Sequence, residues 1–188
     1  MKHYDSMNIR SFTLVGHSGA GKTSVADAFA YLTGLNTRLG SVADGSSLLD
    51  HEPEEKERGG SLTCSFLTCE FANHKFHVAD SPGDGDFIHD AYLPLQAMDG
   101  AVLVVCAVEG IETQTEKMSK LAGDLGTPRA VLINKLDRER ADYTSVLGEV
   151  EEALGIKRGF QAAHQFQLML PIASHHCWPL DRHQPANN

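Results

Sequence analysis

The sequence predicts a three-layer α/β fold in which helices flank a mostly parallel, six-stranded sheet. Three observations support this prediction. Short apolar runs alternate with amphipathic stretches, a glycine-rich loop joins the first run to the first helix-like stretch, and polar motifs follow several of the runs. Because ligands of open α/β sheets bind at the carboxyl ends of the strands, we expect these motifs to lie at one edge.

The first element is the apolar run at residues 9–15, which leads through a glycine-rich octapeptide into a helix-like stretch at 22–33. That order is the context of a phosphate-binding loop. Gly16 and Gly21 let the backbone curl so that its N–H groups point at phosphate oxygens, and the helix N-terminus adds its positive dipole end. The residues expected to bind a nucleotide's phosphates are Gly16, His17, Ser18, Gly19, Ala20, Gly21, Lys22, Thr23 and Ser24.

Two side chains of this loop add chemistry to the backbone. Lys22 is expected to bring positive charge to the outer phosphates, and the Thr23 hydroxyl is a candidate ligand for Mg²⁺. His17 is expected to contribute its backbone rather than an acid or a base. The alternative is a glycine-rich turn that contains Lys-Thr by chance, and the surrounding strand and helix argue against it.

The next elements are a connection and a hairpin. Residues 34–60 form a long polar connection that is rich in charge at 52–58. A connection of that length in a compact domain indicates a functional loop. Residues 62–71 and 75–79 then predict two strands joined by a short turn at 72–74.

The second strand of the hairpin runs into Asp80-Ser81-Pro82-Gly83. In phosphoryl-transfer domains an Asp at this site holds Mg²⁺, often through water, so we expect Asp80 to do so opposite the hydroxyl of Thr23. The backbone N–H of Gly83 can contact a γ-phosphate and so respond to its loss. A tight Ser-Pro-Gly turn without further function is the alternative.

The rest of the chain continues the alternation. Residues 101–108 and 129–133 are short apolar runs typical of buried parallel strands, and residues 112–125 and 138–154 have the apolar spacing of helices. Residues 165–173 are a candidate sixth strand. We therefore expect a nucleotide-binding domain at 7–173, followed by an irregular tail at 174–188.

The strand at 129–133 is followed by a motif that indicates which base is bound, Asn134-Lys135-Leu136-Asp137. The Asp137 carboxylate can accept two hydrogen bonds from the N1–H and 2-amino groups of guanine. Adenine would leave that carboxylate unpaired, at a cost of roughly 1–3 kcal/mol or more. Asn134 would tie the segment to the phosphate loop, and the aliphatic part of Lys135 would cover one face of the base.

Composition excludes several classes of function. The net charge is −9, which argues against direct binding of DNA or RNA, and the longest apolar run is too short to span a membrane. Residues 1–6 lack the apolar core of a secretory signal, so we expect a cytoplasmic protein with reduced thiols at Cys64, Cys69, Cys106 and Cys177. The histidines and cysteine of the tail fit no zinc spacing, and a frayed terminus explains them better than a metal site.

Over residues 9–155 these motifs resemble the GTP-binding (G) domain of translational GTPases, above all elongation factor G and its elongation-factor-G-like relatives. The resemblance also rests on Glu57-Arg58-Gly59 and Asp86-Phe87. It implies a P-loop NTPase (G-domain) fold, GTP or GDP with Mg²⁺ as cofactors, and GTP hydrolysis. It further implies that full-length members carry more domains and act on the ribosome.

Two departures from the family pattern bear on activity. The family has Glu-Arg-Gly-Ile-Thr in its first switch, and here Gly60-Ser61 replaces Ile-Thr, so Ser61 is the candidate Mg²⁺ ligand with Thr23 and Asp80. The family also places a water-orienting His after Asp-Thr-Pro-Gly, and here that position is Asp84. A carboxylate adds negative charge beside the phosphates, so we expect slow hydrolysis and weak stimulation by ribosomes, with Lys22, Gly83 and Asp84 as candidate catalytic residues.

Three functions remain open from the sequence. The first is a slow Mg²⁺-dependent GTPase, the second a GTP/GDP switch with little hydrolysis, and the third a phosphotransferase that uses the same loop. The family's segment over guanine O6 has its nearest counterpart here at residues 172–174, which is a poor match. We therefore expect either a truncated G domain or a change of reading frame near residue 156, with weakened nucleotide binding. Arg58 is either a solvated charge or a catalytic one.

Overall fold

Five strands form a single sheet in the computed structural model, which describes residues 3–155 of the chain. The strand order is β2-β3-β1-β4-β5, with β2 antiparallel to β3 and the other neighbours parallel. The mostly parallel α/β sheet is therefore confirmed, with five strands in the described part instead of six, and the candidate strand at 165–173 lies outside it. The strands are β1 (Ile9–Val15), β2 (Ser65–Phe71), β3 (His74–Asp80), β4 (Gly100–Cys106) and β5 (Arg129–Asn134).

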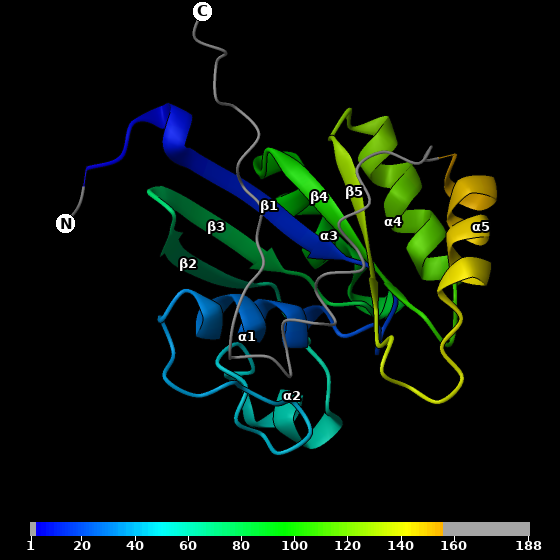
Figure 1. Ribbon diagram of the computed structural model, residues 1–188, viewed down its shortest axis with the longest axis horizontal. Helices are drawn as coiled ribbons and strands as arrows, with labels where there is room; N and C mark the ends of the chain where they lie inside the picture. Colours follow the sequence, from blue (N-terminus) through cyan, green and yellow to red (C-terminus); the bar gives the residue numbers. More distant parts are fainter. Residues whose placement is uncertain (1–2, 156–188) are drawn as a thin grey trace, which may run out of the picture.

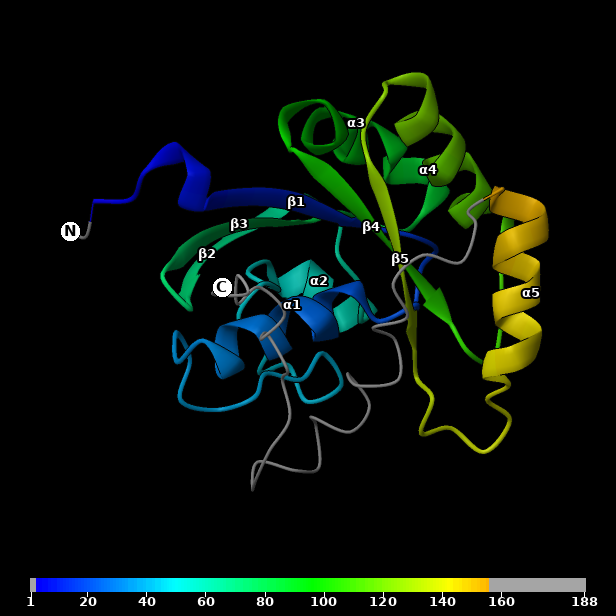
Figure 2. The ribbon, with the colours of Figure 1, turned by 45° about the horizontal axis from the view of Figure 1, so that its top comes forward.

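Helices cover both faces of this sheet (Figure 1, Figure 2). Helix α1 packs on one face, and α3 and α4 pack on the other, while α5 lies beside β5. They are α1 (Lys22–Leu32), α2 (Pro53–Arg58), α3 (Ile88–Ala97), α4 (Thr113–Asp124) and α5 (Tyr143–Leu154), with short 3₁₀ turns at Ser6–Asn8 and Gly85–Phe87.

Strand β4 shows how the sequence builds the two faces. Its side chains alternate in direction, so Val104 packs in the core under α1 whereas Leu103 packs in the core under α3 and α4. Val105 contributes to a third cluster against α5. A strand buried on both faces needs apolar residues at successive positions, which is the pattern seen in its sequence.

Two helices were not predicted. Helix α2 forms inside the long connection at 34–60, where Pro53 occupies the first turn and Glu52 and Glu55 make a reciprocal capping box. Helix α3 contains Pro94, which removes a backbone donor and hides the helical pattern in the sequence.

Two element boundaries differ from the predictions by three residues or more. The strand expected from residue 62 begins at Ser65. The helix expected from residue 138 begins at Tyr143, because Asp142 caps it by accepting a hydrogen bond from the Ser145 N–H at 2.9 Å. The hairpin turn is confirmed, with Ala72 and Asn73 at φ values of 46° and 60°.

Two expectations for the end of the chain stay predictions, namely a domain that ends at residue 173 with an irregular tail at 174–188 and a reduced thiol at Cys177. These residues lie outside the described part. Within residues 3–155, Cys64, Cys69 and Cys106 are free thiols. No helix in that part is long and apolar enough to cross a membrane.

Candidate functional site

The glycine-rich loop at residues 16–23 lies at the carboxyl end of β1 and enters α1 through Gly21. Gly16 and Gly21 have φ values of 145° and 93°. A Cβ at Gly16 would collide with the Val104 carbonyl oxygen, and a Cβ at Gly21 would collide with the Asn134 side chain. Glycine is therefore required at both positions by the backbone conformation and by the available space.

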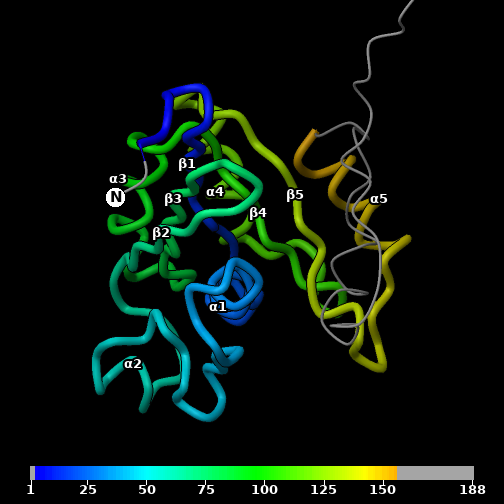
Figure 3. The backbone as a smooth tube through the Cα atoms, turned by 60° about the vertical axis from the view of Figure 1, so that its left-hand side comes forward, coloured from blue at the N-terminus to red at the C-terminus, as the bar shows by residue number. Residues whose placement is uncertain are grey.

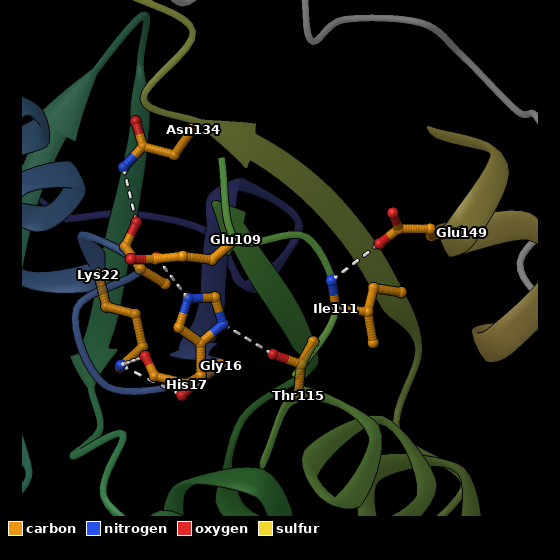
Figure 4. Close-up of polar contacts among 9 residues, drawn as sticks. Gly16, His17, Lys22, Glu109, Ile111, Thr115, Asn134 and Glu149 are labelled. Carbon is orange, nitrogen blue, oxygen red and sulfur yellow. Dashed lines mark hydrogen bonds and ion pairs between the residues drawn. The ribbon is translucent and has the colours of Figure 1, made fainter. Parts of the chain in front are cut away.

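Lys22 is buried and folds back over the loop (Figure 4). Its Nζ donates hydrogen bonds to the carbonyl oxygens of Gly16 at 3.2 Å and His17 at 2.8 Å. Burial lowers the pKa of Lys22 to about 8, although the Asp80 carboxylate acts in the opposite direction. The ammonium group thus lies where an anion held by the loop would meet it.

Oxygen groups from three segments meet beside the loop. The Thr23 and Ser61 hydroxyls are 3.1 Å apart, and Asp80 is only 1% exposed at the end of β3. Neither Asp80 carboxylate oxygen has a hydrogen-bond partner among the described residues. Burial raises the pKa of Asp80 to about 7, against the opposing charge of Lys22. A buried, unpartnered carboxylate beside two hydroxyls offers the hard oxygen ligands that suit Mg²⁺.

Ser61 reaches this position because α2 and the residues after it form one hydrogen-bonded unit. The buried Glu55 carboxylate accepts hydrogen bonds from the backbone N–H groups of Leu62 at 2.8 Å and Thr63 at 3.3 Å. Burial would raise the pKa of Glu55, but these N–H groups, together with those of Glu52 and His51, outweigh it and hold the pKa below its ordinary value. Sequence reasoning missed Glu55, for which the capping box was the available signal.

A second carboxylate ties the long connection to α1. Asp27 is buried on α1 and accepts a hydrogen bond from the Leu48 N–H at 2.9 Å. A Cβ at Gly40 would collide with the same carboxylate. The connection is therefore anchored to the helix that follows the phosphate loop, and nothing in the local sequence signals this contact.

The segment after β3 brings Gly83 and Asp84 to the same area. A Cβ at Gly83 would collide with the Lys22 ammonium and the His17 carbonyl, so the backbone passes directly over the loop. The Asp84 carboxylate accepts a hydrogen bond from the Asp86 N–H at 3.1 Å and forms an ion pair with Arg58. Arg58 is therefore paired, which the sequence alone left open.

The motif expected to bind guanine, residues 134–137, lies at the end of β5. The Asn134 Nδ2 donates to the Ala20 carbonyl oxygen at 2.9 Å, so the predicted tie to the phosphate loop is present. Lys135 is half-buried with a φ of 60°, and Asp137 is exposed in the turn that follows. The motif thus lies beside the phosphate loop with its carboxylate open to a ligand.

His17 has a larger structural role than the backbone contact expected for it. Its side chain is 1% exposed. The Nδ1 atom shares a 3.0 Å hydrogen bond with the Thr115 hydroxyl on α4, and Nε2 lies 3.4 Å from the Glu109 carboxylate (Figure 4). The phosphate loop is therefore anchored to α4, a contact across 98 residues of sequence that no local pattern could reveal.

Comparisons with known proteins show which family this chain resembles. Residues 7–181 match the family model of the elongation factor Tu GTP binding domain. Elongation factor G 2 of Syntrophus aciditrophicus is 40% identical over 144 residues, which are 77% of this chain and 21% of that protein. Elongation factor G 1 of Geobacter sulfurreducens is 37% identical over 146 residues, 78% of this chain and 21% of that protein.

A solved structure from Thermus thermophilus superimposes with a TM-score of 0.75 at 33% identity, over 82% of this chain and 24% of that one. The likeness thus extends from sequence to fold. The chain spans only 21% of the length of the two curated relatives named above.

Proposed function

The chain belongs to the family of elongation factor Tu GTP-binding domains, and from this premise we propose that it binds GTP and GDP with Mg²⁺ and hydrolyses GTP slowly. The Asp80 carboxylate carries the proposal. Burial raises the pKa of Asp80 to about 7 even though the Lys22 ammonium and the Thr23 hydroxyl act in the opposite direction, so a further cation beside this carboxylate would stabilise its charged form. The Thr23 and Ser61 hydroxyls complete an oxygen-lined site for that cation.

The phosphates would lie on the backbone N–H groups of residues 16–23, with the Lys22 ammonium at the outer phosphates. Bound Mg²⁺ supplies positive charge to the phosphate oxygens. Gly83 would present its N–H to the γ-phosphate, because the backbone there passes over Lys22 and His17. Asn134, Lys135 and Asp137 would hold guanine, with Asp137 selecting against adenine.

Slow hydrolysis follows from the position of Asp84. In the family that this chain resembles, a His stands there and orients the attacking water. Here the Asp84 carboxylate forms an ion pair with Arg58 and is therefore not free to orient a water molecule. A second candidate function, a GTP/GDP switch with negligible turnover, is favoured by the same ion pair.

We also propose that a longer protein containing this domain acts on the ribosome in the cytoplasm, as the names of the elongation factor relatives suggest. The net charge of −9 makes the domain itself a poor partner for naked nucleic acid. Contact with the ribosome would therefore rest on a local patch or on other domains.

Single-turnover hydrolysis of GTP and ATP, with and without ribosomes, tests the proposal. We expect slow GTP turnover, no ATP turnover, and loss of GTP turnover in Lys22→Ala. We expect Asp84→His to respond more strongly to ribosomes than the unaltered chain. Strong stimulation of the unaltered chain with no gain in Asp84→His would contradict the role given to Asp84, and tight binding without turnover would favour the switch.

A further inference from the structure

Helix α2 lies at the periphery of the domain (Figure 3). Glu55 is its one buried residue. Apolar burial therefore contributes little to its position, and polar contacts must fix it against the domain.

Hydrogen bonds join α2 to the residues on the far side of Ser61, so α2 and Ser61 belong to one connected unit. Gly59 ends the helix in the left-handed conformation with a φ of 69°. The Glu55 carboxylate then binds the N–H groups of Leu62 and Thr63, on the far side of Ser61. A shift of α2 would consequently shift the Ser61 hydroxyl relative to Thr23.

Arg58, the last residue of α2, connects this unit to the segment after β3. Its guanidinium forms an ion pair with Asp84 and lies 5.4 Å from the centroid of the Phe87 ring. Arginine can make both contacts at once, because the edge of its planar group donates hydrogen bonds to a carboxylate while its face packs on an aromatic ring.

We propose that Arg58 and Asp84 form a latch that holds Ser61 beside Thr23 and so slows release of a Mg²⁺-bound nucleoside triphosphate. The inference rests on the proposed function, and it adds a positioning role for two residues that do not themselves touch Mg²⁺. Arg58 is 51% and Asp84 32% exposed. Exposed pairs contribute modestly, so breaking this latch should speed release by about two- to fivefold at low salt.

The test measures the dissociation rate of a fluorescent, non-hydrolysable GTP analogue from the 188-residue chain in Mg²⁺. The variants are Arg58→Ala, Asp84→Ala, the double variant and the charge swap Arg58→Asp with Asp84→Arg. Arg38→Ala is the matched control, because Arg38 forms an exposed ion pair with Asp44 within the same connection. We expect faster release in both single variants, no further increase in the double variant, recovery in the swap and no change in the control.

Two further measurements separate positioning from a general structural effect. Ser61→Ala should speed release by itself, and adding Arg58→Ala to it should have no further effect. The difference between Arg58→Ala and the unaltered chain should also vanish when Mg²⁺ is chelated, since the latch acts through Ser61.

Additive effects of Arg58→Ala and Asp84→Ala, unchanged rates, or a rate difference that persists without Mg²⁺ would each overturn the latch. Failure of the unaltered chain to bind any guanine nucleotide would instead overturn the proposed function. The two failures are therefore distinguishable in one set of experiments.

Discussion

The side-chain amide of Asn134 at the end of β5 donates a hydrogen bond to the Ala20 carbonyl oxygen of the phosphate loop, 114 residues away, at 2.9 Å. The contact joins the segment expected to bind guanine to the segment expected to bind phosphate. It also fills the space into which a Cβ at Gly21 would project. One amide therefore joins the segment expected to bind the base to the segment expected to bind the phosphates.

Asn134→Ala should weaken GDP binding about fivefold. The variant loses one partly buried hydrogen bond, which contributes about 1 kcal/mol, and the loop loses its tie to β5. Isothermal titration with GDP measures the change. Equal affinity in the variant and the unaltered chain would show that the tie does not position the loop.

Gly16→Ala should destabilise the chain far more than Gly19→Ala. Both glycines have positive φ, at 145° and 80°, so both substitutions carry backbone strain. At Gly16 the new methyl group also meets the Val104 carbonyl, whereas at Gly19 nothing lies within 4 Å. Urea unfolding of the two variants compares them directly, and equal losses would mean that the contact with β4 is not tight.

Thr115→Val should destabilise the domain by roughly 1–3 kcal/mol, because it leaves the buried His17 ring without one hydrogen-bond partner. The matched control is Thr113→Val, an exposed position of the same helix, which should change stability by less than about 0.5 kcal/mol. The measurement is the free energy of unfolding in urea. Similar small losses in both variants would show that the His17 anchor is dispensable.

Without nucleotide and Mg²⁺, stability should fall as the pH rises from about 4 to about 7. Burial raises the pKa of Asp80 to about 7 from 3.8, so in this range the folded chain keeps a proton that the unfolded chain has released. The stability linked to that proton is complete below about pH 4 and lost as the pH passes the folded pKa. Thermal melts in chelator should show this fall in the unaltered chain and a smaller one in Asp80→Asn.

Saturation with GDP and Mg²⁺ should suppress this pH dependence, because a cation beside Asp80 stabilises its charged form. If Asp80→Asn and the unaltered chain show the same pH profile in chelator, the buried carboxylate is not the titrating group.

The sequence predicted those parts of the structure whose signals are local. Apolar runs located the strands, and the loop at 16–23 was recognised because its glycines and the following helix are adjacent in the chain. The tie from Asn134 was also predicted, since parallel strands bring their carboxyl ends to one edge. Helix α3 was missed because Pro94 interrupts its pattern.

The contacts that the sequence did not reveal join residues far apart in the chain. The His17 side chain is anchored by Thr115, and Arg58 is paired with Asp84. From the sequence alone, the His17 ring could equally have been packed without a hydrogen bond, and Arg58 could equally have been an exposed, unpaired charge. The partner of each side chain is decided by the fold, because the sheet determines which loops lie next to one another.

The most direct test of guanine-nucleotide binding is competition against a fluorescent GDP bound to the unaltered chain in Mg²⁺. Unlabelled GDP should displace it, and ADP should require a concentration on the order of a hundredfold higher, because adenine leaves the Asp137 carboxylate unpaired. Displacement by ADP at the same concentration as GDP would contradict the account.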